Sequence, residues 1–256
     1  MPAATIESAA LFLVAARRAR RAGARLPESL RPPDVETALA IQQRVTELLR
    51  LPIGGWKCSL PAADRPVAVA PIYAPTICER SPCAILPIGG MARVEPEIAF
   101  AMAHDLPQRT SPYTEAEVLD AVGEPRLVLE LIGPRYADPG VLTFPEVLAD
   151  AINNQGLYVG PPVIDALQQR LDELAIVIEG GGTRLHAVQG RHGDGHPLKP
   201  LVWLANFLAT RGEGLRAGQI VTTGSYCGVI DVPLNKALTV NFGTLGKLSV
   251  EFNAAA

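Results

Sequence analysis

Apolar and polar positions alternate at helical spacing in the first part of the chain. An alanine-rich segment is predicted to form a helix that begins at a cap on Thr5 and ends at Gly23. After a proline-containing link, Asp34 is predicted to cap a second helix. The apolar positions of this second helix share one face: Ala38, Ile41, Val45 and Leu48. We therefore expect an amphipathic helix that packs on the main domain.

From Gly54 onward the pattern changes to short apolar runs separated by glycine and proline. This punctuation predicts many short strands rather than a parallel sheet with regular intervening helices. Gly180, Gly181 and Gly182 are predicted to form a hairpin loop between two of the strands. The predicted strands fall at residues 83–87, 97–102, 127–132, 175–178, 185–188, 220–223, 238–242 and 248–252.

Three helices are predicted to interrupt this β-rich part. Thr114 and Glu117 form a capping box at the start of the first helix. The second is predicted to begin at Pro145, and the third to follow Pro200 and end near Gly212. The sequence thus predicts an α+β protein with a helical segment over residues 1–53 and a main domain over residues 54–256.

Composition and charge argue against some classes of function. The chain has 256 residues, 48% of them hydrophobic, and a formal net charge of −3, which gives no reason to expect nucleic acid as a partner. The basic run at residues 17–21 is interpreted as a solvated helix end. Its four cysteines lack CxxC spacing, and no run approaches 18 apolar residues. We expect a cytoplasmic protein that has free cysteines and does not bind membranes.

Two carboxylates in the segment 94–100 share a strand face. Alternate side chains of a strand point the same way, so Glu95 and Glu97 lie side by side with Cα atoms roughly 6.5 Å apart. This spacing allows both carboxylates to bind one hard cation. A polar strand face without a ligand is the alternative interpretation.

A third carboxylate, Glu130, interrupts the apolar run 127–132. Burying a lone charged carboxylate costs several kcal/mol unless it is paired or bound to a cation. An ion pair with Arg126, Arg135 or a distant lysine is the alternative. Together with Glu95 and Glu97, Glu130 would complete an all-oxygen site, which suits Mg²⁺ or Mn²⁺ and disfavours zinc.

Six segments in chain order resemble the 2-keto-4-pentenoate hydratase and 4-oxalocrotonate decarboxylase group of the fumarylacetoacetate hydrolase superfamily. Gly55-Trp56-Lys57 opens the first segment, which is similar to a lysine-containing turn of that group. The six segments are residues 55–60, 94–100, 129–136, 149–160, 203–206 and 214–225. The resemblance implies a β-rich mixed-sheet roll of the fumarylacetoacetate hydrolase C-terminal type, with N-terminal helices.

The resemblance also implies an activity. It suggests a Mg²⁺- or Mn²⁺-dependent lyase of aromatic catabolism that adds water to a 2-oxo-alk-4-enoate, converting 2-hydroxypenta-2,4-dienoate to 4-hydroxy-2-oxopentanoate. A homo-oligomer and a small 2-oxo acid substrate are implied as well. The residues implied are Lys57 for catalysis, Glu95, Glu97 and Glu130 for the metal, and Asp150, Thr223, Gly224 and Ser225 for the substrate.

Several of these residues have simpler interpretations. Lys57 could move a proton or hold the substrate carboxylate, or it could be a surface lysine in a turn. Ser225 could donate a hydrogen bond to the substrate or only cap its own turn. The sequence around Ser225 does not match the nucleophile elbow of serine hydrolases. The four histidines are interpreted as lying outside the site: His104 after the metal strand, and His186, His192 and His196 in exposed loops.

Alternative functions remain open at this point. A decarboxylase of 2-oxo-hexenedioate type would use the same metal site. A carbon–carbon bond hydrolase commonly needs an N-terminal histidine base, and no histidine precedes His104. A non-catalytic protein that binds an α-keto acid or a partner subunit is the third possibility. Departures from the family pattern at residues 70–73, 133–135 and 150–155 motivate it.

Overall fold

The computed structural model describes residues 1–63 and 65–255. Its helices are α1 (Ala3–Ala19), α2 (Val35–Leu49), α3 (Glu115–Asp120), α4 (Phe144–Ala149) and α5 (Leu198–Thr210), with short 3-10 turns between elements. Its strands are β1 (Ile53–Ser59), β2 (Ala68–Tyr73), β3 (Ile77–Cys78), β4 (Cys83–Ile85), β5 (Met91–Met102), β6 (Val122–Ile132), β7 (Asn154–Pro162), β8 (Glu173–Gly180), β9 (Thr183–Arg191), β10 (Ile220–Thr222), β11 (Ile230–Pro233), β12 (Ala237–Phe242) and β13 (Lys247–Ala254). The predicted α+β class is confirmed.

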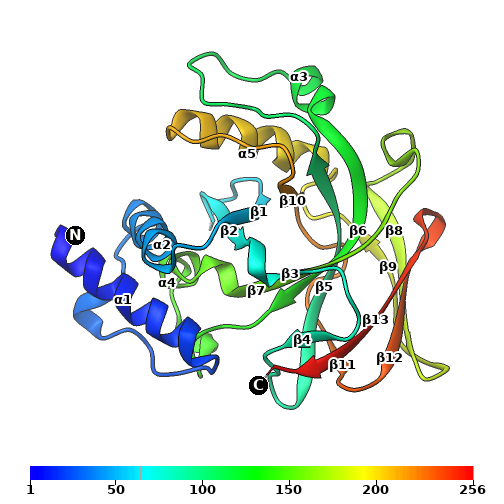
Figure 1. Ribbon diagram of the computed structural model, residues 1–256, viewed down its shortest axis with the longest axis horizontal. Coiled ribbons are helices and arrows are strands. Elements are labelled where there is room, and N and C mark those ends of the chain that lie inside the picture. The colour runs from blue at the N-terminus through cyan, green and yellow to red at the C-terminus, as the bar shows by residue number, and fades with distance from the viewer. Residues whose placement is uncertain (64, 256) are drawn as a thin grey trace.

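The strands form two curled mixed sheets (Figure 1). The first has the order β2-β1-β10-β5-β6-β7-β3, with β11 added beside β5. In it β1 pairs with β10 and β3 with β7 in parallel, and the other pairs are antiparallel. The second has the order β4-β13-β12-β8-β9. Mixed pairing and strong curl give the predicted β-rich roll, with α1, α2 and α4 gathered on one side (Figure 1).

Two clusters of buried apolar side chains pack against the sheets. The larger one joins the helices to both sheets, with Phe100, Leu129, Phe242 and Phe252 among its fully buried members. A smaller one lies on the opposite face of the first sheet: Ile72, Ala99, Val128, Leu157, Val159 and Ile220. Since side chains alternate along a strand, Glu97 and Glu130 lie on the same face as this smaller cluster. The carboxylates therefore share their face of the first sheet with a small apolar cluster.

The N-terminal helices match the prediction in part. Asp34 caps α2 as predicted, and its carboxylate accepts a hydrogen bond from the Thr37 N–H at 2.8 Å. The predicted cap at Thr5 is wrong, because alanines extend α1 back to Pro2 and leave Thr5 inside the helix. The predicted stop at Gly23 is also wrong. The helix ends at Arg20, which adopts a left-handed conformation with φ of 52°.

Elsewhere in the chain, strong local sequence motifs predict the secondary structure correctly. The Thr114–Glu117 capping box opens α3, and the glycine loop joins β8 to β9 as a hairpin. Gly181 and Gly182 have φ of 58° and 79°, values that suit glycine in a tight hairpin turn. The third helix begins at Leu198, three residues before the predicted start after Pro200. Pro200 lies within its first turn, where proline is tolerated.

The predicted turn around Lys57 is instead the strand β1, which lies between β2 and β10. Gly55 is required there, because a Cβ at that position would lie 2.2 Å from the Ile220 carbonyl oxygen of β10. Two adjacent glycines masked the strand, since glycine is rare in strand interiors. Placing Lys57 in the first sheet is what directs its side chain toward the acidic strands.

The boundary after residue 53 coincides with the start of β1 at Ile53, and the division into two domains stays a prediction. All four cysteines are free thiols, as predicted. No helix among the described residues is long and apolar enough to cross a membrane.

Candidate metal centre

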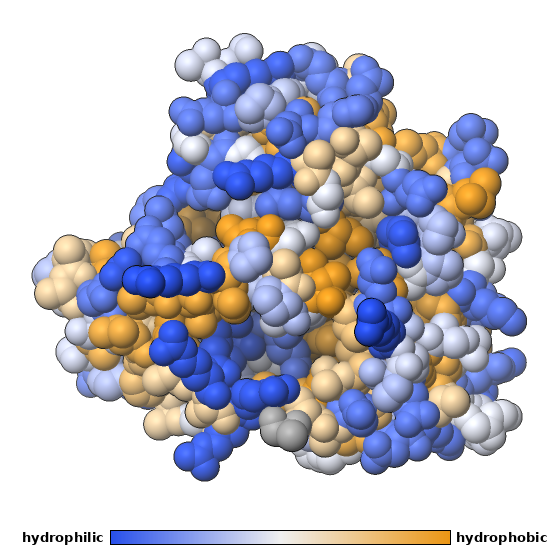
Figure 2. Space-filling model, in the orientation of Figure 1, coloured by the Kyte–Doolittle hydropathy of each residue, from blue (hydrophilic) through white to orange (hydrophobic). Residues whose placement is uncertain are grey.

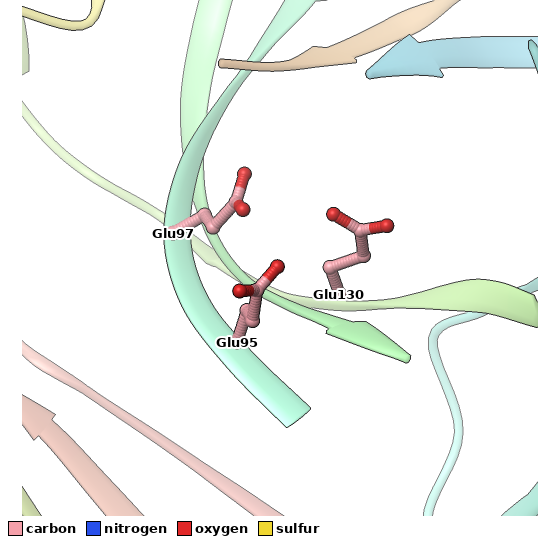
Figure 3. A group of neighbouring side chains, drawn as sticks. All are labelled: Glu95, Glu97 and Glu130. Atoms are coloured by element: carbon pink, nitrogen blue, oxygen red, sulfur yellow. The ribbon is translucent and has the colours of Figure 1, made fainter. Parts of the chain in front are cut away.

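The three glutamates predicted as ligands converge on one face of the first sheet. Glu95 of β5 stands directly opposite Glu130 of β6, and Glu97 follows two residues along β5. One carboxylate oxygen from each glutamate lies within 4.8 Å of those of the other two. Figure 3 shows the three carboxylates pointing toward one another from the two strands. Glu97 and Glu130 are only 2% and 1% exposed, whereas Glu95 is half-buried and leaves the cluster open on one side.

Protein groups hold the carboxylates in this arrangement. The Lys57 ammonium forms an ion pair with Glu130 Oε1, and it also donates to the Ile152 carbonyl at 3.4 Å. The Asn154 side-chain amide donates to Glu130 Oε1 at 2.9 Å. The Gly224 N–H donates to Glu97 Oε2 at 3.1 Å. Glu130 thus forms an ion pair, as the alternative interpretation held, but with distant Lys57 rather than with Arg126 or Arg135.

The crowding of like charges changes the acidity of the cluster. Burial, followed by repulsion from Glu130, raises the pKa of Glu95 to about 7. Burial and the two neighbouring carboxylates raise the pKa of Glu97 well above its ordinary value. Burial by itself would lower the pKa of Lys57, but the attraction of Glu130 and Glu95 outweighs it and the pKa is raised. The carboxylates therefore lack sufficient positive charge from the protein.

The donor set fits a hard divalent cation. Three carboxylates and one ammonium leave two net negative charges in the ionised cluster, which a divalent ion would neutralise. The described residues contribute only carboxylate oxygens to the cluster, with no histidine or cysteine ligand. Such a donor set suits Mg²⁺ or Mn²⁺ and leaves positions for water or a chelating substrate.

Thr222 is a site residue that sequence reasoning missed. On β10 it pairs with Lys57 of β1 on one side and with Ala99 of β5 on the other, so it shares the site face. Its hydroxyl is buried and has no hydrogen-bond partner among the described residues. An unpartnered buried hydroxyl costs about 1–3 kcal/mol unless a ligand satisfies it. Strand alternation on β10 was the available signal.

Three residues predicted to bind substrate follow β10, and they differ in their hydrogen bonds: Thr223, Gly224 and Ser225. The Thr223 hydroxyl is buried and lacks a partner within the described chain. Gly224 has φ of 121° and supplies its N–H to Glu97. The Ser225 hydroxyl donates to the Pro96 carbonyl at 3.3 Å and accepts from the Cys227 N–H. Ser225 therefore caps its own turn in this structure, and its contact with substrate stays a prediction.

Asp150 is fully buried and is paired with arginine. Its two carboxylate oxygens accept hydrogen bonds from the backbone N–H and the side chain of Arg135, at 3.0 and 2.6 Å. Arg17 lies 3.6 Å from the same carboxylate. Asp150 holds in place the segment 150–154, whose far end carries Asn154 beside Glu130. Direct contact of Asp150 with substrate stays a prediction.

Two expectations about exposure are wrong. His192 is 2% exposed rather than lying in an exposed loop, and its ring packs against Tyr226 with centroids 5.4 Å apart. Its ring also lies beside Gly224, where a Cβ would be 3.5 Å from His192 Nε2. Arg17, the first residue of the basic run, is not solvated: its side chain is 13% exposed, whereas Arg18 and Arg20 are exposed.

Asp150→Asn is expected to lower the free energy of unfolding by about 3–5 kcal/mol, because it leaves the Arg135 guanidinium buried without its carboxylate. Urea unfolding followed by circular dichroism measures the change. Asp120→Asn, an exposed position at the end of α3, is the matched control and should change stability little. Unchanged stability in Asp150→Asn would show that the arginine pairing does not support the fold.

Metal binding is expected to tighten as pH rises. The pKa of Glu95 is raised above its ordinary value of 4.5 to about 7 in the metal-free protein. In the metal-free protein, the contribution of Glu95 to the free energy of unfolding is therefore present at low pH and is lost as the pH rises through about 7. Above that pH, metal binding to the ionised carboxylate restores the lost stability. The Mg²⁺-induced rise in Tm should be larger at about pH 8 than at about pH 6. A rise independent of pH, against a NaCl control of matched ionic strength, would contradict this linkage.

Comparison with known proteins agrees with this fold. No family model matches the chain. A 2-keto-4-pentenoate hydratase of Paraburkholderia xenovorans is 29% identical over 163 residues, which are 63% of this chain and 59% of that protein. A 4-oxalocrotonate decarboxylase of Pseudomonas putida is 29% identical over 136 residues, 53% of this chain and 51% of its own length. The matched region thus spans little more than half the length of these relatives. A hydratase of Paraburkholderia phymatum is 27% identical over 97% of each chain.

Solved structures show the fold over the full length. The 4-oxalocrotonate decarboxylase from Pseudomonas putida G7, complexed with magnesium and adipate, is 22% identical and covers 99% of each chain with a TM-score of 0.78. A fumarylacetoacetate hydrolase family protein from Yersinia pestis CO92 is 16% identical and covers 79% of this chain and 94% of its own, with a TM-score of 0.54.

The chain shares its fold with a 4-oxalocrotonate decarboxylase and with a fumarylacetoacetate hydrolase family protein. The resemblance to the 2-keto-4-pentenoate hydratase and 4-oxalocrotonate decarboxylase group, predicted from the six segments, is confirmed.

Proposed function

We propose that this protein is a divalent-metal-dependent lyase that adds water to a 2-oxo-alk-4-enoate. The observation that carries the proposal is the convergence of Glu95, Glu97 and Glu130 beside the buried ammonium of Lys57. Relatives named 2-keto-4-pentenoate hydratase support the reaction type, and a neighbour complexed with magnesium supports the metal. Mg²⁺ or Mn²⁺ is the proposed cofactor.

The ion would be held by the three glutamates, with Glu130 kept in position by Asn154 and Lys57. When bound, it would supply a Lewis acid that polarises the 2-oxo group and a template for the adjacent carboxylate of the substrate. The buried hydroxyl of Thr222, which lies on the site face, would donate a hydrogen bond to that substrate. The apolar residues that share the site face would lie beside the carbon chain of the substrate.

Lys57 is the residue that would move a proton in this proposal. Addition of water puts the hydroxyl on C4 and requires protons to be transferred between oxygen and carbon along the chain. The Lys57 ammonium faces the cluster, and its hydrogen bonds to Glu130 and to the Ile152 carbonyl fix its position. A positioned proton donor of this kind typically contributes a factor of about 10²–10⁴ to the rate.

Decarboxylation on the same site is the second candidate. Relatives named 4-oxalocrotonate decarboxylase match this chain at nearly the same identity as the hydratases, and the structural neighbour from Pseudomonas putida G7, which is 22% identical, has the same name. Loss of CO₂ from a 2-oxo-hexenedioate leaves electron density that a polarised 2-oxo group stabilises in the same way. The three ligands and Lys57 would serve both reactions.

The deciding experiment follows two reactions with purified protein. Metal-dependent loss of dienol absorbance from 2-hydroxypenta-2,4-dienoate supports the hydratase, and metal-dependent release of CO₂ from a 2-oxo-hexenedioate supports the decarboxylase. EDTA-treated protein is the control. Tight Mn²⁺ binding without turnover of either substrate would overturn the enzyme proposal and favour a protein that only binds an α-keto acid or a partner subunit.

We also propose a homo-oligomer located in the cytoplasm. Large apolar side chains stand exposed at separate places in the chain: Leu11, Val141, Ile164, Leu167 and Val229. Apolar side chains exposed singly are also normal on monomers, so the proposal of an oligomer rests on the resemblance to the hydratase and decarboxylase group. Sedimentation equilibrium measures the assembly, and a monomer at micromolar concentration would overturn this part of the proposal.

A further inference from the structure

A cavity of about 750 Å³ lies away from the acidic cluster, between the end of α1, the segment from β2 to β4, and the end of β13. Figure 2 shows a hollow on this face, with hydrophilic side chains around its mouth. Its lining includes Arg17, Arg18, Arg20, Arg80 and Arg135, which come from three separate parts of the chain. Folding therefore concentrates arginines that are far apart in the sequence.

This cavity lies at the β3 edge of the first sheet, and its lining residues differ from those of the candidate metal centre. Leu131 lines it, whereas its neighbour Glu130 belongs to the acidic cluster. Adjacent residues on a strand point to opposite faces, so Leu131 reaches the cavity from the face of β6 that is opposite to Glu130. None of Lys57, Glu95 and Glu97 lines the cavity. A ligand held here would be distinct from the proposed substrate.

The inner end of the cavity has more positive than negative charge. The guanidiniums of Arg17 and Arg135 share one carboxylate, that of Asp150. The Arg17 Nε is buried and has no hydrogen-bond partner among the described residues. Burial, followed by repulsion from Arg135, lowers the pKa of Arg17 to about 10. An additional anion would compensate the second guanidinium and satisfy its free N–H.

The mouth of the cavity adds further positive charge. Arg18, Arg20 and Arg80 are exposed, and none of them forms an ion pair within residues 1–63 and 65–255. Glu79 is the single acidic residue of the lining, and it too forms no such pair in this part of the chain. The wall between the arginines is apolar: Leu49, Leu51, Ile77, Leu86 and Leu131.

We propose that this cavity binds a small organic carboxylate with an apolar or aromatic body. Arginine presents paired N–H donors that match the two oxygens of a carboxylate. The carboxylate would lie between Arg17 and the arginines of the mouth, and the body would lie against the apolar wall. An inorganic anion would gain the charge interaction but not the apolar contact, so it should bind more weakly.

The same arginines hold a segment that reaches the candidate metal centre. Arg17 donates to the Asp150 carbonyl at 3.3 Å, and Arg135 donates to the carbonyls of Asp150 and Asn154 at 2.8 and 2.7 Å. The segment 150–154 then contacts Lys57 through the Ile152 carbonyl and Glu130 through the Asn154 amide. A carboxylate bound to Arg17 would therefore order a segment that both sites share.

Calorimetry on the full chain in EDTA tests the site. Removing divalent metal prevents the probe from chelating an ion at the acidic cluster, so the result is independent of the proposed lyase activity. The probes are 4-bromobenzoate and inorganic phosphate. Wild-type protein should bind 4-bromobenzoate more tightly than phosphate. The double variant Arg18→Gln/Arg80→Gln changes only exposed side chains and should bind it about tenfold more weakly.

Arg184→Gln, an exposed arginine on β9 that lines no part of this cavity, is the matched control and should bind like the wild type. A crystal soaked in 4-bromobenzoate should show the bromine anomalous peak in the cavity. Binding should also slow hydrogen exchange of the 150–154 amides in wild-type protein. Equal affinity of the wild type and the double variant, phosphate binding as tight as that of the aromatic probe, or a peak outside the cavity would overturn the proposal.

Discussion

Glu130→Gln is expected to abolish metal-dependent turnover while leaving the fold intact. The change removes one of three charged ligands and should weaken Mn²⁺ binding by more than about 100-fold, since even residues that only orient a metal ligand contribute 10–100-fold. Glutamine has nearly the same volume, so the packing around β6 is kept. The Lys57 ammonium still has Glu95 and Glu97 beside it, which limits the cost in stability.

Isothermal titration with Mn²⁺, turnover of the dienol and far-ultraviolet circular dichroism measure the three properties separately. Glu124→Gln makes the same chemical change at an exposed position of the same strand and should behave as the wild type. Full activity of Glu130→Gln would remove Glu130 from the site. Loss of activity together with the native spectrum would instead show that the defect is not one of folding.

Lys57→Met is expected to lower kcat by about 10²–10⁴-fold without weakening Mn²⁺ binding. The methionine keeps an apolar stem of similar length but cannot donate a proton or hold a carboxylate. Removing the ammonium also removes a positive charge that competes with the ion for Glu130, so metal affinity should stay the same or rise. This separation of kcat from metal affinity distinguishes a catalytic lysine from a structural one.

The same variant should be less stable in EDTA by about 3–5 kcal/mol, because it leaves the Glu130 carboxylate buried without its cation, and Mn²⁺ should restore most of that loss. Lys199→Met, at an exposed position of α5, is the matched control. Wild-type kcat in Lys57→Met would exclude a role for Lys57 in proton transfer and return it to the interpretation of a lysine that only balances charge.

The parts of the site that the sequence predicts correctly depend on short-range periodicity. Glu95 and Glu97 share a face because strand side chains alternate, and Glu130 stands out because a charge interrupts an apolar run. The same is true of the cap at Asp34 and of the Thr114 capping box, since both are hydrogen bonds closed within one helical turn.

The parts that the sequence misses depend on contacts between distant segments. The glycines beside Lys57 indicate a turn in the sequence. In the structure, Gly55 packs closely against Ile220 of the neighbouring strand β10. Thr222 belongs to the site only because β10 lies between β1 and β5. The sequence predicts that Arg17 is one more solvated cation. In the structure it contacts Asp150, which is 133 residues away in the chain. No local pattern encodes such neighbours.

Local patterning in the amino-acid sequence was enough to determine which strands carry carboxylates, which faces they share, the α+β class and the family that the chain resembles. Only the tertiary structure decided that Lys57 pairs with Glu130, that the Thr222 hydroxyl is buried on the site face with no partner among the described residues, and that arginines line a separate cavity. The physical reason is that periodicity and capping act over a few residues, whereas strand order and charge compensation are settled by long-range packing.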